Sequence, residues 1–231
     1  TKYPEIELSP RLYYLVNSKI YLNNGQYEFA LKEIEYCLGI EENKIILNNT
    51  FLYGTYLLQA RILNRMKNYN KAKEICLKIY KQSTFTKLDS DLIALTYIEL
   101  STAELGLNSI NNDAFNYAEQ AYKLLKNNKI RNNDILHSRD TYLADAIVAK
   151  SNALSSVGKP QQAIEGYLVA EVIYYNKYKN NMKNIDDISY MYYNAALAGK
   201  NMKTNSIWFT QFHNKHLKYF GQNHQRSKEL D

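Results

Sequence analysis

Apolar side chains recur along this chain with the spacing of α-helices that bury one face. The clearest example is the stretch from residue 151 to 170. In it, Ala163, Tyr167 and Ala170 follow one another at i, i+4 and i+7, which places them on one side of a helix. The Gly-Lys-Pro run at residues 158–160 precedes them. Glycine tolerates a left-handed C-terminal cap, and proline suits the first turn of the next helix. The stretch therefore predicts two helices separated by a sharp bend.

The same arrangement occurs five times. The residues that pack just after each bend are Ala30, Ala72, Ala118, Ala163 and Trp208. They lie 42 to 46 positions apart, and in four units a small residue stands twelve positions earlier, as Ser151 does before Ala163. Periods of about 20–50 residues indicate stacked helical hairpins. We therefore predict an all-α fold, a right-handed α-solenoid of about five hairpins and about ten helices, over residues 10–219. Residues 1–9 would form an extended lead-in and residues 220–231 a polar C-terminal tail that frays.

The fifth unit departs from the others in a way that would keep the packed volume constant. Trp208 stands where the other units have alanine. The facing position on the first helix is Gly199, where other units have Tyr21, Leu63 and Leu154. Because close packing conserves volume across a contact, we expect the indole to fill the space over Gly199.

Composition agrees with long helices and disfavours several other classes. The 231 residues include only 8 glycines and 3 prolines, too few for the turns of an all-β fold. The net charge of +6 is mild, and most of the excess lies in residues 177–231, which carry nine basic and four acidic side chains. Cys37 and Cys76 fall within helical stripes, so we expect both to be buried and free. No apolar run is long enough to span a membrane, and we expect a cytoplasmic protein.

Residues suited to catalysis or metal binding are sparse. His213 and His216 lie three positions apart on the last predicted helix, without an acidic or cysteine partner nearby. The acidic pair at residues 186–187 falls at a predicted helix start, where carboxylates favour the positive end of the helix dipole. The bend at residues 158–160 lacks the spacing of a phosphate-binding loop. We therefore expect no enzymatic activity, no metal ion and no small-molecule cofactor.

Short motifs around three of the bends resemble those of the tetratricopeptide repeat (TPR) family. They are the runs Gly25-x-Tyr27-x-x-Ala30, Asn68-Tyr69-x-x-Ala72 and Gly158-x-Pro160-x-x-Ala163. The resemblance covers roughly residues 10–220. The step is longer than the family's usual period of about 34 residues, so the chain is similar to long-helix arrays such as those of kinesin light chain and of bacterial peptide sensors. This resemblance implies a concave face that binds a protein or peptide segment.

The first helix of each hairpin would line that concave face. The candidate peptide-binding residues on it are Lys19, Asn23, Arg61, Asn64, Arg65, Asn152, Tyr190 and Asn194. Asparagine can pair with an extended backbone, lysine and arginine can hold carboxylates, and tyrosine adds a rigid contact. In the TPR family, asparagines and basic groove residues hold peptide main chain and C-terminal carboxylates. The resemblance implies such a role for Lys19, Arg61, Asn64, Arg65 and Asn152.

Two functions fit these observations. The first is a non-catalytic scaffold that binds a protein or peptide segment. The alternative is the sensor domain of a bacterial transcription regulator or signalling protein whose effector domain lies outside this sequence. In that case this chain would act on nucleic acid only indirectly, through the effector domain. The sequence leaves the identity of the partner and the oligomeric state open.

Overall fold

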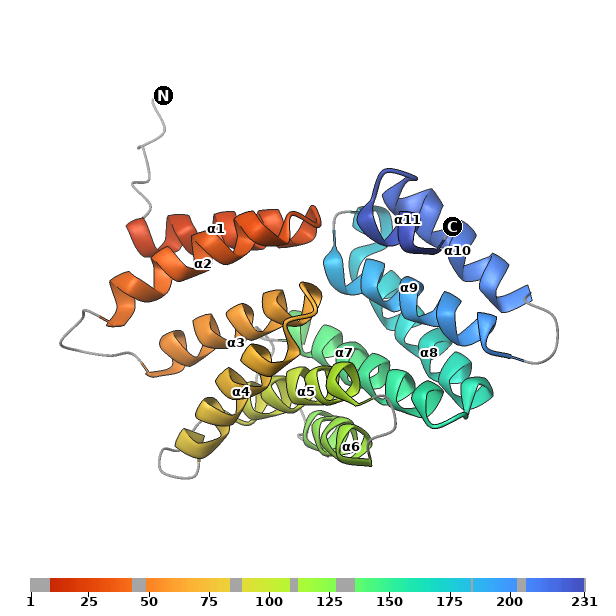
Figure 1. Cartoon of the computed structure of the whole chain (residues 1–231), viewed down its shortest axis with the longest axis horizontal. Coiled ribbons are helices and arrows are strands. Elements are labelled where there is room, and N and C mark those ends of the chain that lie inside the picture. Colours follow the sequence, from red (N-terminus) through yellow and green to blue (C-terminus); the bar gives the residue numbers. More distant parts are fainter. Residues whose placement is uncertain are drawn as a thin grey trace.

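The chain folds as a series of antiparallel helical hairpins (Figure 1). The computed structural model describes residues 9–42, 49–83, 89–108, 112–127, 136–183, 185–202 and 207–230. The helices in these ranges are α1 (Pro10–Asn23), α2 (Tyr27–Glu42), α3 (Asn49–Arg65), α4 (Tyr69–Ser83), α5 (Ser90–Leu107), α6 (Asn112–Asn127), α7 (Leu136–Ser156), α8 (Pro160–Tyr178), α9 (Asp186–Lys200), α10 (Ile207–Phe220) and α11 (Gln225–Leu230). A short 3-10 turn, Lys179–Asn181, follows α8. All regular structure in the described ranges is helical, which confirms the predicted all-α class. None of these helices has the length and apolar content needed to cross a bilayer.

The hairpins stack in sequence order around an arc. Helices α1 to α10 form five hairpins, and the second helix of each packs against the first helix of the next. The first helices α3, α5, α7 and α9 also contact one another in turn, so they form the inner side of the arc. In Figure 1 the arc brings the first hairpin, α1 and α2, close to α9 and α11. The array of five hairpins that the sequence predicts is therefore confirmed.

The bends within the hairpins use the residues that the sequence predicts. Gly25 and Gly158 have φ angles of +72° and +77°, a left-handed conformation that favours glycine. Lys67 stands at the corresponding bend of the second hairpin with φ of +62°, which costs a non-glycine residue roughly 1–3 kcal/mol. Pro10 and Pro160 each occupy the first turn of a helix.

Small residues bring the two helices of a hairpin together. In the first hairpin, the Ser18 hydroxyl donates to the carbonyl oxygen of Ala30 at 2.8 Å. In the fourth hairpin, Ser151 faces Gly166, where an added Cβ would lie 2.1 Å from the serine Oγ. The sequence pattern singled out Ala163 here, which is fully buried, but it gave no weight to Gly166.

Most of the predicted core positions are buried. Fully buried members of the predicted stripes include Ala30, Ala72, Ala118, Ala163, Tyr167, Ala170, Cys37 and Cys76. Both cysteines are free, as predicted.

Gly199 faces Trp208, as the sequence predicts, but the closest atoms belong to the α10 backbone. A Cβ at this position would lie 2.5 Å from the backbone nitrogen of Phe209 and 2.9 Å from the carbonyl carbon of Trp208. The backbone of α10 and the Cβ of Trp208 therefore lie closest to Gly199. The Trp208 ring is half-buried and stacks on Phe212, with 6.1 Å between ring centroids.

The last described residues do not form a frayed tail. Residues 225–230 form α11, in which Arg226, Ser227 and Leu230 are buried. Leu230 belongs to the hydrophobic core of the fourth and fifth hairpins. Because a buried leucine and a buried arginine anchor it, this segment is a structural part of the array.

Replacement of Gly199 by alanine is expected to lower the free energy of unfolding by about 1–3 kcal/mol, because the added methyl group would overlap the α10 backbone. Gly39 is a matched control, since a Cβ there meets nothing within 4 Å and the residue lies inside α2. Gly39→Ala should raise stability by up to about 1 kcal/mol. Urea denaturation followed by circular dichroism measures both effects. Equal effects at the two sites would contradict the close contact between α9 and α10.

Candidate functional site

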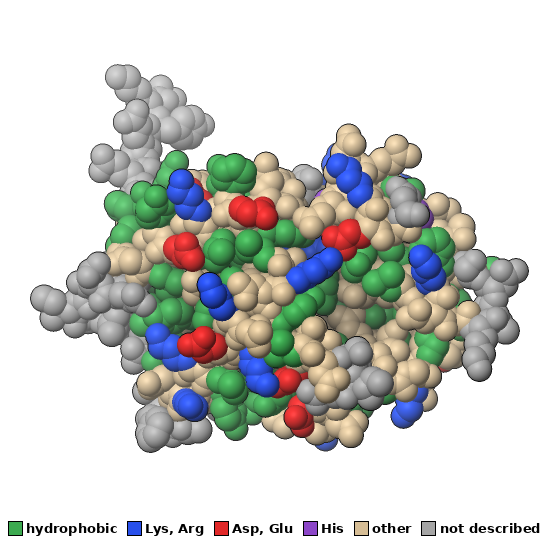
Figure 2. All heavy atoms as spheres, viewed as in Figure 1, with side chains coloured by type: hydrophobic (Ala, Val, Ile, Leu, Met, Phe, Trp, Pro, Cys, Tyr) green, Lys and Arg blue, Asp and Glu red, His purple; other side chains and the backbone are tan. Residues whose placement is uncertain are grey.

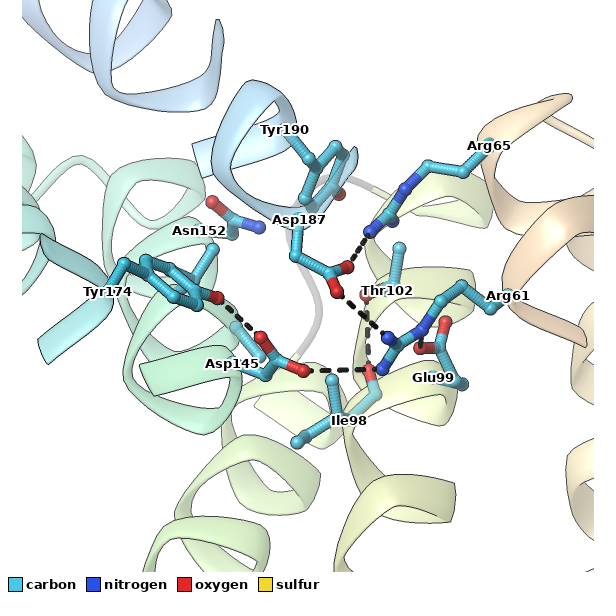
Figure 3. Close-up of a pocket in the computed structure, with 12 residues that line it drawn as sticks. Arg61, Arg65, Ile98, Glu99, Thr102, Asp145, Asn152, Tyr174, Asp187 and Tyr190 are labelled. Atoms are coloured by element: carbon cyan, nitrogen blue, oxygen red, sulfur yellow. Dashed lines mark hydrogen bonds and ion pairs between the residues drawn. The ribbon is translucent and has the colours of Figure 1, made fainter. Parts of the chain in front are cut away.

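The inner side of the arc carries a cluster of charged side chains, with Arg61 of α3 at its centre (Figure 3). The Arg61 Nε donates to Glu99 on α5 at 2.7 Å, and Nη1 donates to Asp187 on α9 at 3.0 Å. Nη2 lies 3.4 Å from a carboxylate oxygen of Asp145 on α7. One guanidinium group therefore joins α3 to the three other first helices that follow it.

Arg65 lies one turn further along α3. Its Nε donates to Asp186 at 2.6 Å and its Nη2 to Asp187 at 3.0 Å. The Arg65 guanidinium carbon also lies 3.8 Å from the centre of the Tyr190 ring, a favourable cation–π geometry. Arg226 of α11 reaches Asp186 as well, with Nη2 at 2.9 Å from a carboxylate oxygen. Burial alone would raise the pKa of Asp186, but Arg226 and Arg65 outweigh it and lower this pKa to about 2.

Asp145 lies in a different electrostatic environment. Burial, followed by the nearby carboxylate of Asp187, raises the pKa of Asp145 to about 7. The Tyr174 hydroxyl donates a hydrogen bond to it. The charged members of the cluster are Arg61, Arg65, Arg226, Glu99, Asp145, Asp186 and Asp187. Three arginines thus face four acidic side chains, and pairing of this kind offsets the desolvation cost of buried ions.

The first hairpin meets the fifth at the same cluster. The Asn23 Oδ1 accepts a hydrogen bond from the backbone nitrogen of Asp186 at 3.2 Å. Asn23 thereby caps α9, whose own N-cap residue, Ile185, makes no side-chain capping bond. The Tyr27 hydroxyl donates to Asp186 at 3.1 Å. Burial and then the Asp186 charge raise the pKa of Tyr27, which keeps the phenol protonated as a donor. The array is thus closed by contacts between its two ends.

Two histidines hold α11 in place. His216 of α10 is fully buried, and its ring nitrogens lie 2.9 Å from the Ser189 Oγ and 3.0 Å from the Ser227 Oγ. His224 precedes α11, and its Nδ1 accepts a hydrogen bond from the backbone nitrogen of Arg226, so that the ring caps this helix. Burial, followed by neighbouring basic groups, lowers the pKa of His216 to about 3 and that of His224 to about 4. Over the described ranges, no three His, Cys, Asp or Glu side chains are arranged to hold a metal ion.

Two hollows flank the charged cluster. The smaller, of about 240 Å³, lies at the side of the hairpin bends and borders α2, α3, α4, α9 and α11. Its wall includes four tyrosines, which are Tyr27, Tyr69, Tyr190 and Tyr193. The larger, of about 390 Å³, lies between α1, α3, α5 and α7. Leucine is the most frequent residue in its wall, which also includes phenylalanine, tyrosine and the charged residues Lys19, Asp89 and Asp91.

The eight candidate residues are distributed over these features. Those in or beside the charged cluster are Asn23, Arg61, Arg65, Asn152 and Tyr190. Those that line the smaller hollow are Asn64, Arg65, Tyr190 and Asn194. Lys19 is exposed at the larger hollow. The structure therefore brings seven of the eight to one region of the inner face and separates Lys19 from them.

Asn64 is the candidate with an unused hydrogen-bonding group. Its Nδ2 donates to the backbone oxygen and to a carboxylate oxygen of Glu99, both at 3.0 Å. Its Oδ1 is buried and accepts no hydrogen bond from the described residues. A buried acceptor without a donor costs about 1–3 kcal/mol. By contrast, the Asn152 Oδ1 accepts a hydrogen bond from the Tyr167 hydroxyl at 2.6 Å.

Sequence reasoning missed the acidic half of the cluster and Arg226. Glu99 and Asp145 are buried carboxylates within first helices, on the same inner side as Arg61. A buried carboxylate requires a positive partner. Acidic residues at these inward-facing positions could therefore have predicted a cluster of ion pairs. Asp187 lies in the first turn of α9 as expected, but it also bonds two arginines of α3.

Comparison with known proteins supports the fold. The structure is similar to the crystal structure of a Podospora anserina protein described as a kinesin light chain with nearly identical TPR-like repeats. The TM-score is 0.50 at 15% sequence identity, and the match covers 94% of this chain and 98% of that chain. The chain matches no protein-family model and no curated protein sequence. The similarity confirms the predicted resemblance to long-helix arrays, and at this identity it concerns the fold alone.

Arg61→Met is expected to lower the free energy of unfolding by about 3–5 kcal/mol, because it leaves buried carboxylates without their counter-charge. Lys19→Met is the control. Since Lys19 is exposed, this change should alter stability by less than about 0.5 kcal/mol. Chemical denaturation of both variants measures the difference. A loss for Arg61→Met as small as that of the control would show that the cluster does not stabilise the array.

His216 and His224 should make the folded protein less stable as the pH falls below about 6.5, the ordinary pKa of histidine, and this loss opposes the gain from protonation of Asp145. The unfolded chain then takes up protons at His216 and His224, whereas the folded chain does so only near the lowered pKa values of about 3 and 4. His224→Asn removes one titrating group and keeps an oxygen that can cap α11. The variant should therefore lose less stability between pH 6.5 and pH 4. Thermal midpoints measured across this range test the prediction, and parallel curves for the two proteins would contradict it.

Proposed function

We propose that this TPR-like repeat array is a non-catalytic module that binds a protein or peptide segment at the smaller hollow of its inner face. Helical-hairpin solenoids use such inner surfaces for binding. The observation that carries the proposal is the wall of this hollow, in which Asn64 and Asn194 lie together with Tyr190 and Tyr193. The amide of Asn194 suits the backbone of an extended segment, because an asparagine side chain can donate and accept at once.

The wall of the smaller hollow has the composition of a peptide-binding surface. Tyr190 and Tyr193 supply rigid faces that lose little conformational entropy on binding. Asn194 is half-buried beside them, and its Nδ2 donates to the backbone oxygen of Tyr190 in its own helix. The volume is below the 300–1,000 Å³ or so of pockets that enclose small molecules. A bound segment would therefore insert a side chain into the hollow and lie across its rim.

A negative group on the ligand suits the rim of the hollow. Lys67 is 63% exposed there, and its ion pair with Glu229 at 3.3 Å is an exposed one. Exposed ion pairs contribute only about 0–1 kcal/mol, so an acidic side chain or a C-terminal carboxylate can replace Glu229 at low cost. Arg65 already bonds Asp186 and Asp187, and it would add positive potential to the wall without a new bond.

The other candidate residues have supporting roles in this proposal. Arg61, Asn23 and Asn152 each bond a partner within the chain and hold the wall in shape. Lys19 borders the other hollow and would not touch the ligand. The same contacts would serve a scaffold or the sensor domain of a regulator, because both require recognition of a peptide.

Asn194→Ala should weaken peptide binding roughly 5- to 30-fold, the equivalent of about 1–2 kcal/mol for a lost hydrogen bond to the ligand. Peptides selected from a random display library against the full chain supply the ligands. Fluorescence anisotropy with labelled copies of these peptides measures their affinity for each variant.

Lys19→Ala is the control, because it changes the larger hollow and leaves the smaller one intact. Its affinity for the selected peptides should match that of the unmodified chain. Circular dichroism confirms the fold of both variants. Failure to select any peptide, or a loss of binding with Lys19→Ala but not with Asn194→Ala, would overturn the assignment to the smaller hollow.

A further inference from the structure

A carboxylate that belongs to the chain itself lies at the rim of the smaller hollow. The Glu229 Oε2 accepts a hydrogen bond from the Tyr193 hydroxyl at 2.9 Å and lies 3.3 Å from the Lys67 Nζ. The Gln225 Nε2 donates to the Glu229 Oε1 at 3.3 Å. These donors come from α9, from the bend between α3 and α4, and from α11. Side chains from three parts of the array therefore hold both oxygens of one carboxylate.

The donors keep this carboxylate ionised. Burial alone would raise the pKa of Glu229, but hydrogen bonds from Tyr193 and Lys67 outweigh it and lower this pKa. Burial and then the hydrogen bond to Glu229 raise the pKa of Tyr193, so the phenol stays protonated as a donor. Lys67 and Tyr193 together thus suit a negatively charged oxygen at this point of the rim.

The wall of the smaller hollow carries an excess of positive charge. Arg65, Lys67 and Arg226 line it, and Glu229 is the one acidic side chain among the described residues that do so. On the face drawn in Figure 2, the charged side chains of the described residues are scattered among apolar and neutral ones and form no large patch of one sign. Attraction of a negative ligand to this face would therefore depend on a local site.

The backbone at Lys67 gives independent support for a functional role of its side chain. The amide nitrogens of Gly25, Lys67 and Gly158 each donate to the carbonyl oxygen three residues earlier, so the three positions are equivalent in the repeat. All three have a positive φ, of +72°, +62° and +77°. Glycine adopts this conformation freely, whereas lysine adopts it at a cost in free energy. The second hairpin thus has an ammonium group at a bend where glycine would be more stable.

Glu229 is not needed to hold α11 in place. Arg226, Ser227 and Leu230 of this helix are buried and anchor it. By contrast, the side chains of Lys67 and Glu229 are 63% and 28% exposed. Because an exposed ion pair contributes little to stability, the Glu229 carboxylate can leave its partners while α11 stays folded.

We infer that Lys67 and Tyr193 form a carboxylate site, that Glu229 fills this site in the free protein, and that a bound segment displaces Glu229 with a carboxylate of its own. The inference rests on the proposed function, since it concerns the ligand of the same hollow. Glu229 acts as an internal competitor, because a ligand binds only the fraction of molecules in which the site is open. A segment that brings a carboxylate restores the contacts that Glu229 loses, so the site selects acidic ligands.

Glu229→Gln should strengthen the binding of acidic peptides roughly 3- to 10-fold, because it removes the charge that competes for Lys67. Fluorescence anisotropy measures this change with the peptides selected against the full chain. Glu165→Gln is the matched control. Glu165 is an exposed glutamate of α8 outside the wall of the smaller hollow, so its replacement makes the same change in net charge and should leave the affinity unchanged.

Lys67→Gly separates recognition from stability. It removes the ammonium group and places glycine at a left-handed position, so the thermal midpoint should rise while the affinity for acidic peptides falls roughly 5- to 10-fold. A lysine that served only the structure would change both quantities in the same direction. Thermal melts followed by circular dichroism and the same anisotropy titrations give the two values.

Matched peptides identify the carboxylate that is bound. Each selected peptide is prepared with a free C-terminus, with a C-terminal amide, and with its acidic side chains replaced by their amides. If the C-terminal carboxylate fills the site, the form with a C-terminal amide loses the gain from Glu229→Gln. If an acidic side chain fills it, the form with neutral side chains loses that gain.

Three results would overturn the inference. They are an affinity of Glu229→Gln no higher than that of Glu165→Gln, equal binding of the acidic peptide and both neutral forms, and full affinity of Lys67→Gly. The proposed function is tested separately by Asn194→Ala. If that variant weakens binding and Glu229→Gln has no effect, the hollow remains a peptide site and the carboxylate site is wrong. If no peptide is selected, both proposals are wrong.

Discussion

The Arg61 guanidinium is the interaction on which the shape of this array depends. It contacts carboxylates on three other helices, and each contact fixes the position of one repeat relative to α3. The transfer of charges out of water costs several kcal/mol for each ion, so the cluster is stable only when every member has a partner. The partners come together only if α3, α5, α7 and α9 follow the observed arc. The curvature of the array is therefore specified by electrostatics on its inner side as well as by apolar packing between hairpins.

This arrangement changes how stability is distributed along the repeats. In an open solenoid, each repeat contacts only its neighbours and the ends unfold independently. Here Tyr27 of the first hairpin and Arg65 of the second both bond Asp186 at the start of α9. Helix α11 adds Arg226 to the same carboxylate. A perturbation of the fifth hairpin thus reaches the first two directly, without passing through the repeats between them.

The sequence allowed prediction of the repeats because the contacts within a hairpin are local. Ser18 and Ala30 lie twelve positions apart, and a bend with glycine or proline separates them, so a short pattern records their contact. The cluster was not predictable in this way. Arg61 bonds residues that lie 38, 84 and 126 positions away, and no local spacing encodes such pairs. The projection of the helical period correctly placed Arg61, Arg65 and Asn64 on the inner face, but their partners within the chain depend on the final curvature. The α11 helix was missed for the same reason, because its buried arginine is stabilised only by distant residues.

The hydrogen bond between Tyr27 and Asp186 spans 159 positions of sequence, whereas the contacts inside each hairpin are local. Local contacts form early in folding, and contacts between distant segments must first overcome the entropy of loop closure. We therefore expect the hairpins to assemble before the ends of the array join. Interactions made after the transition state slow unfolding and leave the folding rate almost unchanged. The junction between the first and fifth hairpins would then act chiefly as a kinetic barrier, and it would extend the lifetime of the native state.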